Sequence, residues 1–450
     1  MANTLQKNLG ATGVLYDERR DFYISPNVTK ELWTDVAPFL TTLSNIETRS
    51  DLKDPVFKMF EHRNPWQKQE FQGDAVTIPD NSVGVEVTPV SGSIVGLSAP
   101  SVTTGDDSWI GLVFEIWDST KTTRKGQCIC LAMATAHPKL AALGSDGGTI
   151  DTAANDYYIC IGNAQGEGME SPEPWADELK IVWNACQIFK TPLQITGTLQ
   201  AAVLRGESNE LARLRSQKSQ EHKIQKERAF LLGTRIGGTG LADSRDGTTV
   251  DTFGDAGRTS GAINGTVGKV RSTYGALAAV LDYGSSDSTL DHQNIFPITE
   301  ASFKYSDWVD ITEKMFQYVP TSGFKRAFCG AGALSFWNKL SSNSGFASNS
   351  GWDVHLGDMD RDRLGFNYRM LETPHGLLQL IPTPVLTRSP YNKYMLCIDD
   401  SNVFHAQYRP SKYQTNIKTD NAYDGVKDQY FCDEGMGLQM IESHSVMYIQ

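Results

Sequence analysis

The sequence TLQAAVLRGESNELARLRSQKSQEHKIQKERAFLL, residues 198–232, decides the fold, because it runs for 35 positions without a proline. Its apolar residues fall near helical spacing between charged ones, as Leu211, Leu214, Ile224 and Leu231 illustrate. We therefore predict one helix over 198–232, with a kink at Gly206 as the open alternative. At about 1.5 Å per residue this helix would be about 50 Å long, which exceeds the usual three or four turns of a globular helix.

The segments on either side of this helix predict a mixed chain. From Ala75 to Gly162, short apolar or alternating runs are separated by Gly-rich and Asp-rich breaks, a pattern typical of a small β-rich module. After the helix, ten glycines between Gly233 and Gly268 predict a long loop. Helices then alternate with strands as far as residue 396, and strands dominate to the C-terminus. The predicted fold class is α+β.

The charge of the chain excludes one mode of binding. Lys and Arg total 41 against 53 Asp and Glu, which gives a net charge of −12. The chain as a whole therefore lacks the basic surplus that tight nucleic-acid binding requires. Most of the acidity lies in the β-rich region, since residues 80–180 hold 14 acidic and 5 basic side chains. A solvated acidic face is the simplest interpretation of this region.

The sequence also bears on compartment and redox chemistry. Met1–Gly10 has no apolar core flanked by basic residues, so we expect no secretory signal. The longest apolar run, residues 128–136, is much shorter than the roughly 20 residues of a membrane span. We expect a soluble chain made in a cytoplasm. Its seven cysteines are scattered over a long chain, which favours buried thiols over a disulfide framework.

A search for chemical motifs finds no catalytic, metal or cofactor site. The stretch around Gly268 and Lys269 lacks both the first glycine and the final Ser or Thr of a phosphate-binding loop. The alternating carboxylates from Asp358 to Asp362 lack the turn glycine and the bidentate acid of a calcium loop. The eight histidines have no His or Cys partner at a metal-ligand spacing. We therefore expect a protein that is not an enzyme.

Four strings, taken in order and spacing, resemble a family of tailed-bacteriophage major capsid proteins. The resemblance runs from about Asp54 to the C-terminus. The strings are IGNAQGEG (161–168), NACQIFKTPLQITGT (184–198), HKIQKERAFLLG (222–233) and NIKTDNAYDGVKDQYFCDEGMGLQMIESHSV (416–446).

The resemblance implies the Hong Kong 97-type capsid fold, and the elements predicted from the residues fit its parts. An N-terminal arm leads into an extended loop, which is followed by a peripheral domain with a long spine helix and by an axial domain. The expected boundaries are 1–50 for the arm, 51–178 for the extended loop with its acidic β-rich insertion, 179–269 for the peripheral domain with spine helix 198–232 and Gly-rich loop, 270–396 for the axial domain and 397–450 for the return strands of the peripheral domain.

The function implied by the resemblance is structural. Copies of the chain would self-assemble into the hexamers and pentamers of an icosahedral phage head that encloses double-stranded DNA. The implied partners are a separate scaffolding protein, a portal and cement proteins, with weak non-specific contact to packaged DNA and no membrane. The chain would belong to the virion after assembly in the host cytoplasm.

Given the resemblance, aromatic residues of the arm and the extended loop are the candidates for contacts between subunits, because Tyr and Trp supply large contact areas at low entropic cost. The candidates are Tyr16, Tyr23, Trp33, Phe39 and Trp66. Two other classes of protein stay open at this stage. A virion decoration or tail protein would explain the β-rich module, and a glycan-active enzyme would explain the many Asp and Trp residues.

Overall fold

A computed structural model describes most of the chain, and the fold is α+β, as predicted. The described residues are 37–62, 69–90, 93–94, 108–134, 137–144, 148–168, 171, 179–202, 209–235, 262–263, 266–267, 270–286, 293–318, 323–342, 360–361, 367–388, 390–417 and 424–450.

The chain divides into two compact units. Unit 1 comprises Met1–Phe60 and Ile181–Gln450, and unit 2 comprises Glu61–Lys180. Unit 2 is therefore an insertion within unit 1, and each unit has its own hydrophobic core.

The first sheet of unit 1 has four strands in the order β1-β21-β22-β12. Strands β12 and β22 pair antiparallel over ten residues of β12, and β1 is parallel to β21. Burial alternates along β12, with Phe189, Leu193 and Ile195 on the covered face, as the two-residue period of a strand requires. The bounds are Thr48–Arg49 for β1, Gln187–Thr196 for β12, Val403–Gln414 for β21 and Gly425–Leu438 for β22.

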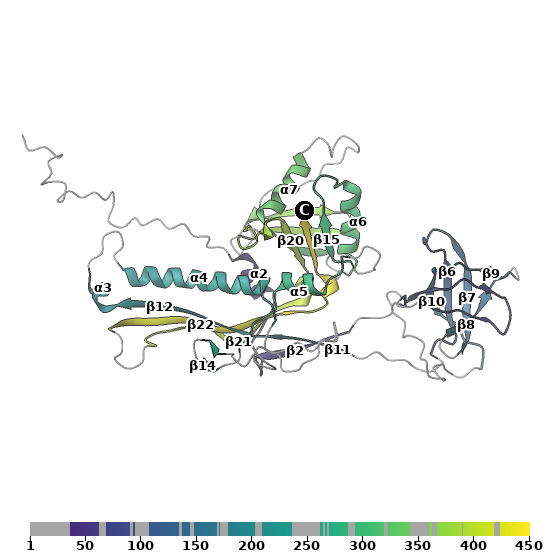
Figure 1. Cartoon of the computed structure of the whole chain (residues 1–450), viewed down its shortest axis with the longest axis horizontal. Helices are drawn as coiled ribbons and strands as arrows, with labels where there is room; N and C mark the ends of the chain where they lie inside the picture. The colour runs from purple at the N-terminus through teal and green to yellow at the C-terminus, as the bar shows by residue number, and fades with distance from the viewer. Residues whose placement is uncertain are drawn as a thin grey trace, which may run out of the picture. The chain divides into compact units, whose positions relative to one another are not determined.

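A long helix, α4 (Glu210–Leu232), lies along this sheet beside β12 and β22 (Figure 1). The predicted single helix over 198–232 is wrong at its beginning. A short helix, α3 (Gly197–Ala201), ends where Ala202 adopts an extended backbone. Helix α4 starts anew at Asn209, whose side chain accepts a hydrogen bond from the N–H of Ala212. Residues 203–208 lie outside the described part of the chain.

The second sheet of unit 1 has seven strands in the order β15-β23-β20-β16-β19-β18-β17. Helices α6 (Tyr305–Met315) and α7 (Ala331–Ser342) cover one face, where Trp308 and Trp337 pack against each other. The strands are β15 (Ile295–Ile298), β16 (Phe324–Cys329), β17 (Asp360–Arg361), β18 (Asn367–Thr373), β19 (Gly376–Pro382), β20 (Tyr394–Ile398) and β23 (Ser445–Ile449). Strand β23 lies in this sheet, although β21 and β22 from the same C-terminal segment lie in the four-stranded one.

One continuous core joins the two sheets of unit 1. It contains Phe230 and Leu231 from the end of α4 together with residues from α5 (Ala276–Tyr283) and α2 (Pro38–Ile46). The C-terminal end of α4 is thus fixed by apolar packing, and we estimate about 1.5–3 kcal/mol for each large side chain buried there. Short elements complete the unit, namely β2 (Val56–Glu61) paired with β11 (Lys180–Ala185), β13 (Ala262–Ile263) paired with β14 (Thr266–Val267), and the 3-10 helices Tyr391–Lys393, Asp400–Asn402 and Ile441–Ser443.

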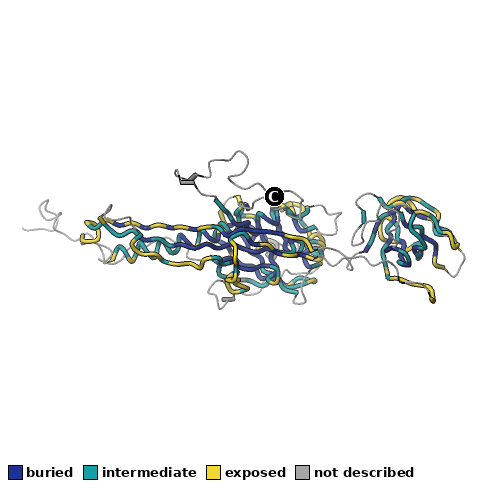
Figure 2. Tube along the Cα trace, turned by 90° about the horizontal axis from the view of Figure 1, so that it is seen from below, coloured by how far each residue is buried: buried dark blue, intermediate teal, exposed yellow. Residues whose placement is uncertain are grey.

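Unit 2 is a β-rich module, in agreement with the strand pattern of its sequence. Its antiparallel sheet has six strands in the order β3-β10-β6-β7-β8-β5, beside a two-stranded pair, β4 and β9. Phe71 stacks on Tyr158 and meets Phe114 edge to face in the core, which Figure 2 shows as buried tube. The strands are β3 (Glu70–Gly73), β4 (Thr77–Ile78), β5 (Val85–Glu86), β6 (Leu112–Trp117), β7 (Arg124–Ala134), β8 (His137–Leu143), β9 (Ile150–Asp151) and β10 (Asp156–Asn163).

The search for membrane spans gives a negative result for the described residues. None of the helices there combines the length and the apolar composition that crossing a bilayer requires.

Proline in place of Leu214 tests whether α4 is continuous at its fifth residue. We expect Leu214→Pro to lower the free energy of unfolding by about 3 kcal/mol or more, because it removes a helical hydrogen bond and clashes with the carbonyl of Glu210. Leu214 is only partly buried, so Leu214→Ala should cost less than the about 2–5 kcal/mol of a fully buried leucine. Urea unfolding measures both variants, and equal small losses would contradict a continuous helix.

Candidate functional site

The side chains that hold α4 against the four-stranded sheet are largely polar. The buried residues of the helix are His222, Lys226, Glu227, Phe230 and Leu231, so three of the five can carry charge. A buried polar group is costly unless it has a hydrogen-bonded partner. The partners of these side chains on the sheet therefore determine where the helix lies.

The contact nearest the beginning of α4 is made by Arg215. Its guanidinium lies 3.1 Å from a carboxylate oxygen of Asp428 on β22, and its Nε donates to the hydroxyl of Tyr413 on β21 at 2.7 Å. The Tyr413 hydroxyl in turn donates to Asp428. Burial alone would raise the pKa of Asp428, but hydrogen bonds from Tyr413, the N–H of Asn416 and Arg215 hold it below its usual range. This end of the helix is tied to the second and third strands of the sheet.

The middle contact is a neutral one between His222 and the sheet. Its Nδ1 lies 2.9 Å from the hydroxyl of Thr191, and its Nε2 lies 3.3 Å from the sulfur of Cys432. Burial lowers the pKa of His222 to about 4, so the imidazole is uncharged at neutral pH. Burial raises the pKa of Cys432 to about 12. The thiol is therefore not a thiolate, and this Cys–His pair is not arranged as a nucleophile and its base.

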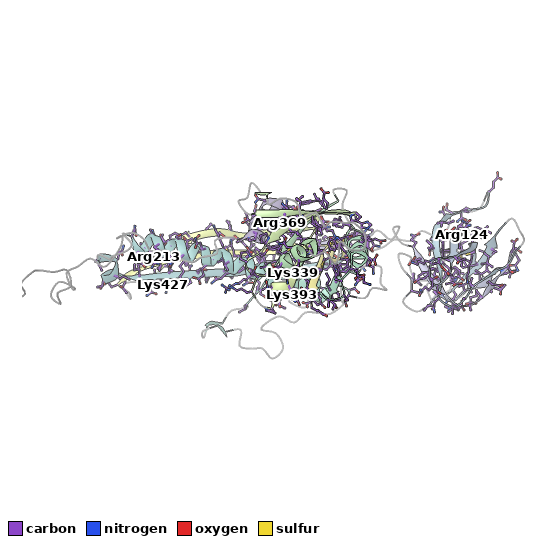
Figure 3. All side chains as sticks on the ribbon, turned by 90° about the horizontal axis from the view of Figure 1, so that it is seen from above. Arg124, Arg213, Lys339, Arg369, Lys393 and Lys427 are labelled. Atoms are coloured by element: carbon purple, nitrogen blue, oxygen red, sulfur yellow. The ribbon has the colours of Figure 1, made fainter. Side chains whose placement is uncertain are left out.

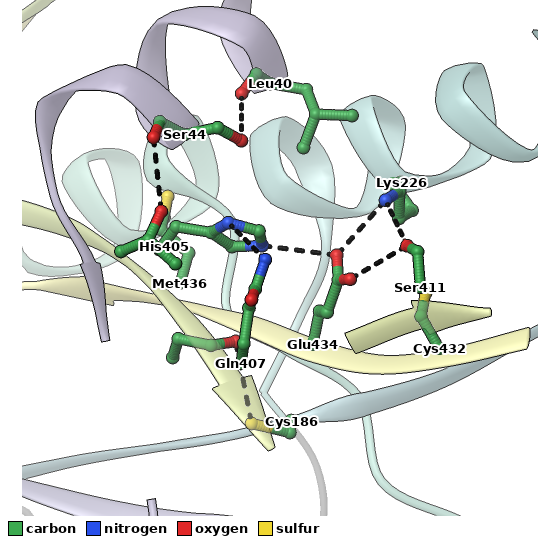
Figure 4. A network of polar contacts seen from close by, with 12 residues as sticks. Leu40, Ser44, Cys186, Lys226, His405, Gln407, Ser411, Cys432, Glu434 and Met436 are labelled. Atoms are coloured by element: carbon green, nitrogen blue, oxygen red, sulfur yellow. Dashed lines mark hydrogen bonds and ion pairs between the residues drawn. The ribbon is translucent and has the colours of Figure 1, made fainter. Parts of the chain in front are cut away.

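The third contact is a buried network around Glu434 (Figure 4). Lys226 donates to this carboxylate at 3.1 Å and to the hydroxyl of Ser411 at 3.0 Å. His405 Nε2 lies 3.2 Å from the same carboxylate, which also accepts from Ser411 at 2.9 Å. Burial would raise the pKa of Glu434, but the hydrogen bond from His405 and the charge of Lys226 lower it to about 2. Glu434 is thus ionised throughout the physiological range.

A fourth titratable side chain, Glu227, points away from these contacts toward helix α2. It is fully buried, and burial raises its pKa to about 8 while the N–H groups of Leu40 and Phe39 offset part of the rise. Those N–H groups belong to the first turn of α2, where a carboxylate is electrostatically favoured. Neither carboxylate oxygen of Glu227 makes a hydrogen bond within the described part of the chain, so Glu227 is a buried ionisable group that faces the first turn of α2.

The chemistry available in this region is structural. The described residues contain no group of three or more His, Cys, Asp or Glu side chains that could hold a metal ion. All seven cysteines are free, and six are buried, which confirms the prediction of buried thiols.

The residues predicted to contact neighbouring subunits are placed only in part. Phe39 is completely buried in the core of its own chain, where its ring meets Phe328 edge to face at 5.0 Å. Its side chain therefore packs within one subunit and is not presented to a neighbour. Tyr16, Tyr23, Trp33 and Trp66 lie outside the described residues.

Sequence reasoning missed the polar contacts because their partners are far apart in the chain. Lys226 and Glu434 are separated by 208 positions, and Arg215 and Asp428 by 213. One signal was present. His222 and Lys226 are four residues apart, and a helix with so few apolar residues on any face must use polar partners to pack.

Comparisons with known proteins identify a family. A family model described as SU10 major capsid protein matches residues 15–440. No curated protein matches the chain. Among solved structures, the chain is similar to the capsid of an empty GTA particle (6% identity, 98% of each chain, TM-score 0.43), the capsid of Myoviridae phage XM1 (7% identity, 95% of this chain and 96% of that one, TM-score 0.40) and the SrpI encapsulin of Synechococcus elongatus PCC 7942 (8% identity, 61% and 76%, TM-score 0.35).

Removing the charge of Glu434 should strongly destabilise the fold, because it leaves Lys226 buried without a counter-charge. We expect Glu434→Gln to lower the free energy of unfolding by about 3–5 kcal/mol, and the double variant with Lys226→Met to lose less than the two single losses together. The partly exposed pair Lys218–Glu221 on the same helix is the control, since Lys218→Met with Glu221→Gln should cost under about 1 kcal/mol. Additive losses in urea unfolding would contradict a coupled pair.

Glu227 should make stability fall as the pH rises. Its pKa is higher in the folded chain, about 8, than in the unfolded chain, so the folded state binds more protons between about pH 4.5 and 8. We expect wild type to lose up to a few kcal/mol relative to Glu227→Gln across this window. Urea unfolding at several pH values measures the difference, with Glu221→Gln as the control. A pH-independent difference between wild type and Glu227→Gln would contradict the burial of an ionisable carboxyl.

Proposed function

Because the chain belongs to the SU10 major capsid protein family, it is a structural subunit of a phage head, and we propose that its copies form the hexamers and pentamers of an icosahedral shell around double-stranded DNA. The family is one of shell subunits in the virion and not of enzymes. Membership of this family also excludes the alternatives of a decoration protein, a tail protein and a glycan-active enzyme.

The observation that best supports the proposal is the long helix-and-sheet element. Helix α4 spans 23 residues and is attached to β12, β21 and β22 by three separate polar contacts before its end enters the core. A subunit that sets the geometry of a closed shell must hold its interfaces at fixed positions. An element that is tied down along its length meets that requirement better than one attached at a single end.

The proposed parts of the subunit follow the expected boundaries except at β23. We assign 1–50 to the arm, 51–178 to the extended loop with its insertion, 179–269 to the peripheral domain and 270–396 to the axial domain. Of the expected returning strands in 397–450, β21 and β22 lie in the four-stranded sheet, whereas β23 joins the seven-stranded sheet and is assigned to the axial domain. The aromatic residues Tyr16, Tyr23, Trp33 and Trp66 are proposed to anchor the chain on neighbouring subunits. Permanent interfaces of this kind bury about 2,000–5,000 Å².

The proposed partners are those of a shell filled with DNA. We propose a separate scaffolding protein, a portal and cement proteins, together with weak and non-specific contact to packaged DNA. Assembly would take place in the host cytoplasm. The net charge of −12 suits a container for DNA, because strong attraction to the wall would hinder packing and release.

Electron microscopy of the chain co-expressed with its scaffolding protein tests the proposal. We expect closed shells from wild type, and compact free subunits from the triple variant Tyr16→Ala, Tyr23→Ala and Trp33→Ala, because each lost aromatic anchor can cost about 2 kcal/mol or more of binding.

The matched control replaces all three residues with Phe, which keeps an aromatic ring at each position. It should form closed shells at nearly the wild-type yield. Normal shells from the alanine variant would contradict the role of these anchors. Failure of wild type itself to assemble with its scaffold would contradict the proposed function.

A further inference from the structure

The four-stranded sheet of unit 1 has a second face, turned away from α4, that is covered over only half its length. Near the core, Phe57 and Met59 of β2 and Val182 of β11 pack on Phe404 and Ala406 of β21. Tyr408 packs against the same cluster, and beyond it the described part of the chain places no further strand pair on this face. Among the described residues, the outer halves of β12, β21 and β22 are therefore bare on this side.

Strand register determines which side chains lie on the bare half. Phe189 and Cys432 are opposite each other and face α4, so the next pair, Lys190 and Phe431, faces the other way. By the same alternation Lys427, opposite Gln194, lies on the bare side. Arg409 and Lys412 of β21 pair with Asp433 and Phe431 and complete the set. We call Lys190, Arg409, Lys412 and Lys427 the basic face.

The carboxylates of these strands are buried, and the one that lies on the same side as the basic face, Asp433, is paired with arginines. Strands β12 and β21 contain no Asp or Glu, and the three carboxylates of β22 are at most 1% exposed. Asp428 and Glu434 are used by α4, and Asp433 is paired with Arg271 at 3.5 Å and with Arg409 at 3.1 Å. The sheet thus buries its negative charges and leaves its positive ones outside.

The remaining cations of the basic face have no counter-charge of their own. Within the described part of the chain, Lys190, Lys412 and Lys427 make no ion pair. Lys190 and Arg409 lie over the ring of Phe431, at 5.9 and 4.5 Å from its centre. Figure 3 labels Lys427 on the long element formed by α4 and the strands. Solvent-facing cations gathered around an aromatic ring make a surface suited to an acidic partner.

Unit 2 has the opposite charge. Residues 61–180 hold 17 acidic and 7 basic side chains, a balance of −10, whereas the rest of the chain holds 36 and 34, a balance of −2. Asp80, Glu86, Asp151 and Glu167 are among its exposed carboxylates. Nearly the whole net charge of the protein therefore lies on the inserted unit.

We propose that the basic face of one subunit binds the acidic unit 2 of a second copy of this chain. The inference rests on the proposed assembly into shells. Each shell would present the two surfaces in equal numbers, so every basic face has one acidic unit available. DNA would compete with unit 2 for the basic face, because it is also an anion. The net charge of −10 on each inserted unit, however, repels DNA from any surface close to such a unit.

A contact of this kind should depend on ionic strength. The Debye length falls from about 14 Å at 50 mM salt to about 4 Å at 500 mM. Charge complementarity at the rim of an interface guides orientation and rate more than it adds affinity. The basic face would therefore help to select the correct docking of neighbours during assembly.

Zero-length carbodiimide cross-linking tests the contact directly, because it joins lysine amines to carboxylates that touch. Wild-type shells are assembled from equal parts of 14N- and 15N-labelled subunits, which distinguishes links between copies from links within one. We expect links between copies from Lys190, Lys412 or Lys427 to carboxylates of residues 61–180, in shells but not in free subunits. Lys339 and Lys393, which are exposed beside Glu300 in unit 1, should give none.

A charge reversal supplies an independent readout. Lys190→Glu with Lys427→Glu should lower the yield of closed shells roughly tenfold, whereas Lys339→Glu with Lys393→Glu, which changes the net charge equally, should leave it unchanged. Circular dichroism checks that each subunit is folded.

The outcomes are distinct. Wild-type shells without these links, or links confined to a single copy, overturn the inference and leave the proposed function intact. Empty shells at full yield from the Lys190→Glu and Lys427→Glu variant, with loss of packaged DNA alone, would assign the basic face to DNA and also overturn it. Absence of wild-type shells is instead the failure of the proposed function.

Discussion

The need to satisfy buried charge between α4 and its sheet is the constraint on which unit 1 depends. Lys226 and Glu434 are buried, and each charge would be strongly unfavourable there without the other. The pairing of β21 with β22 brings the additional partners His405 and Ser411 to Glu434. A shift of α4 along the sheet would break this network, so the network specifies one position of the helix where an apolar seam would tolerate several.

The same constraint accounts for the unequal faces of the sheet. All three carboxylates of β22 are buried, two of them against α4 and Asp433 in its pair with Arg271 and Arg409, and the lysines of the three strands lie on the face turned away from α4. The basic face is therefore a by-product of the way the helix is held. In a chain whose acidity is concentrated in an inserted unit, this separation of charge gives copies of the subunit complementary surfaces.

Much of the architecture could be predicted from local pattern. The strand runs of the inserted unit predicted β structure, because a half-buried strand needs a two-residue period. The absence of proline predicted a helix over 198–232, and α4 confirms it for 210–232. The break at Ala202 was not predicted, since Leu199, Gln200 and Ala201 are good helix formers and the sequence suggested only a kink at Gly206.

The contacts that position the helix could not be predicted from the sequence, because they join residues about 200 positions apart. A single sequence carries no record of such pairings. The placement of Phe39 illustrates the same limit. From the sequence alone, an aromatic residue near the N-terminus is equally compatible with an anchor on a neighbouring subunit and with a part of the chain's own core. Only the packing of α2 against Phe328 decides between the two.

Hydrogen–deuterium exchange along α4 tests most directly whether separate polar contacts hold the helix. Asp428→Asn removes the charge that anchors Arg215 and leaves the network around Glu434 in place. The amides of residues 214–220 should then exchange faster than in wild type, while those of residues 222–232 keep their protection, because local opening is confined to the part that has lost its partner. Unchanged exchange along the whole helix, or equal acceleration from end to end, would contradict the account.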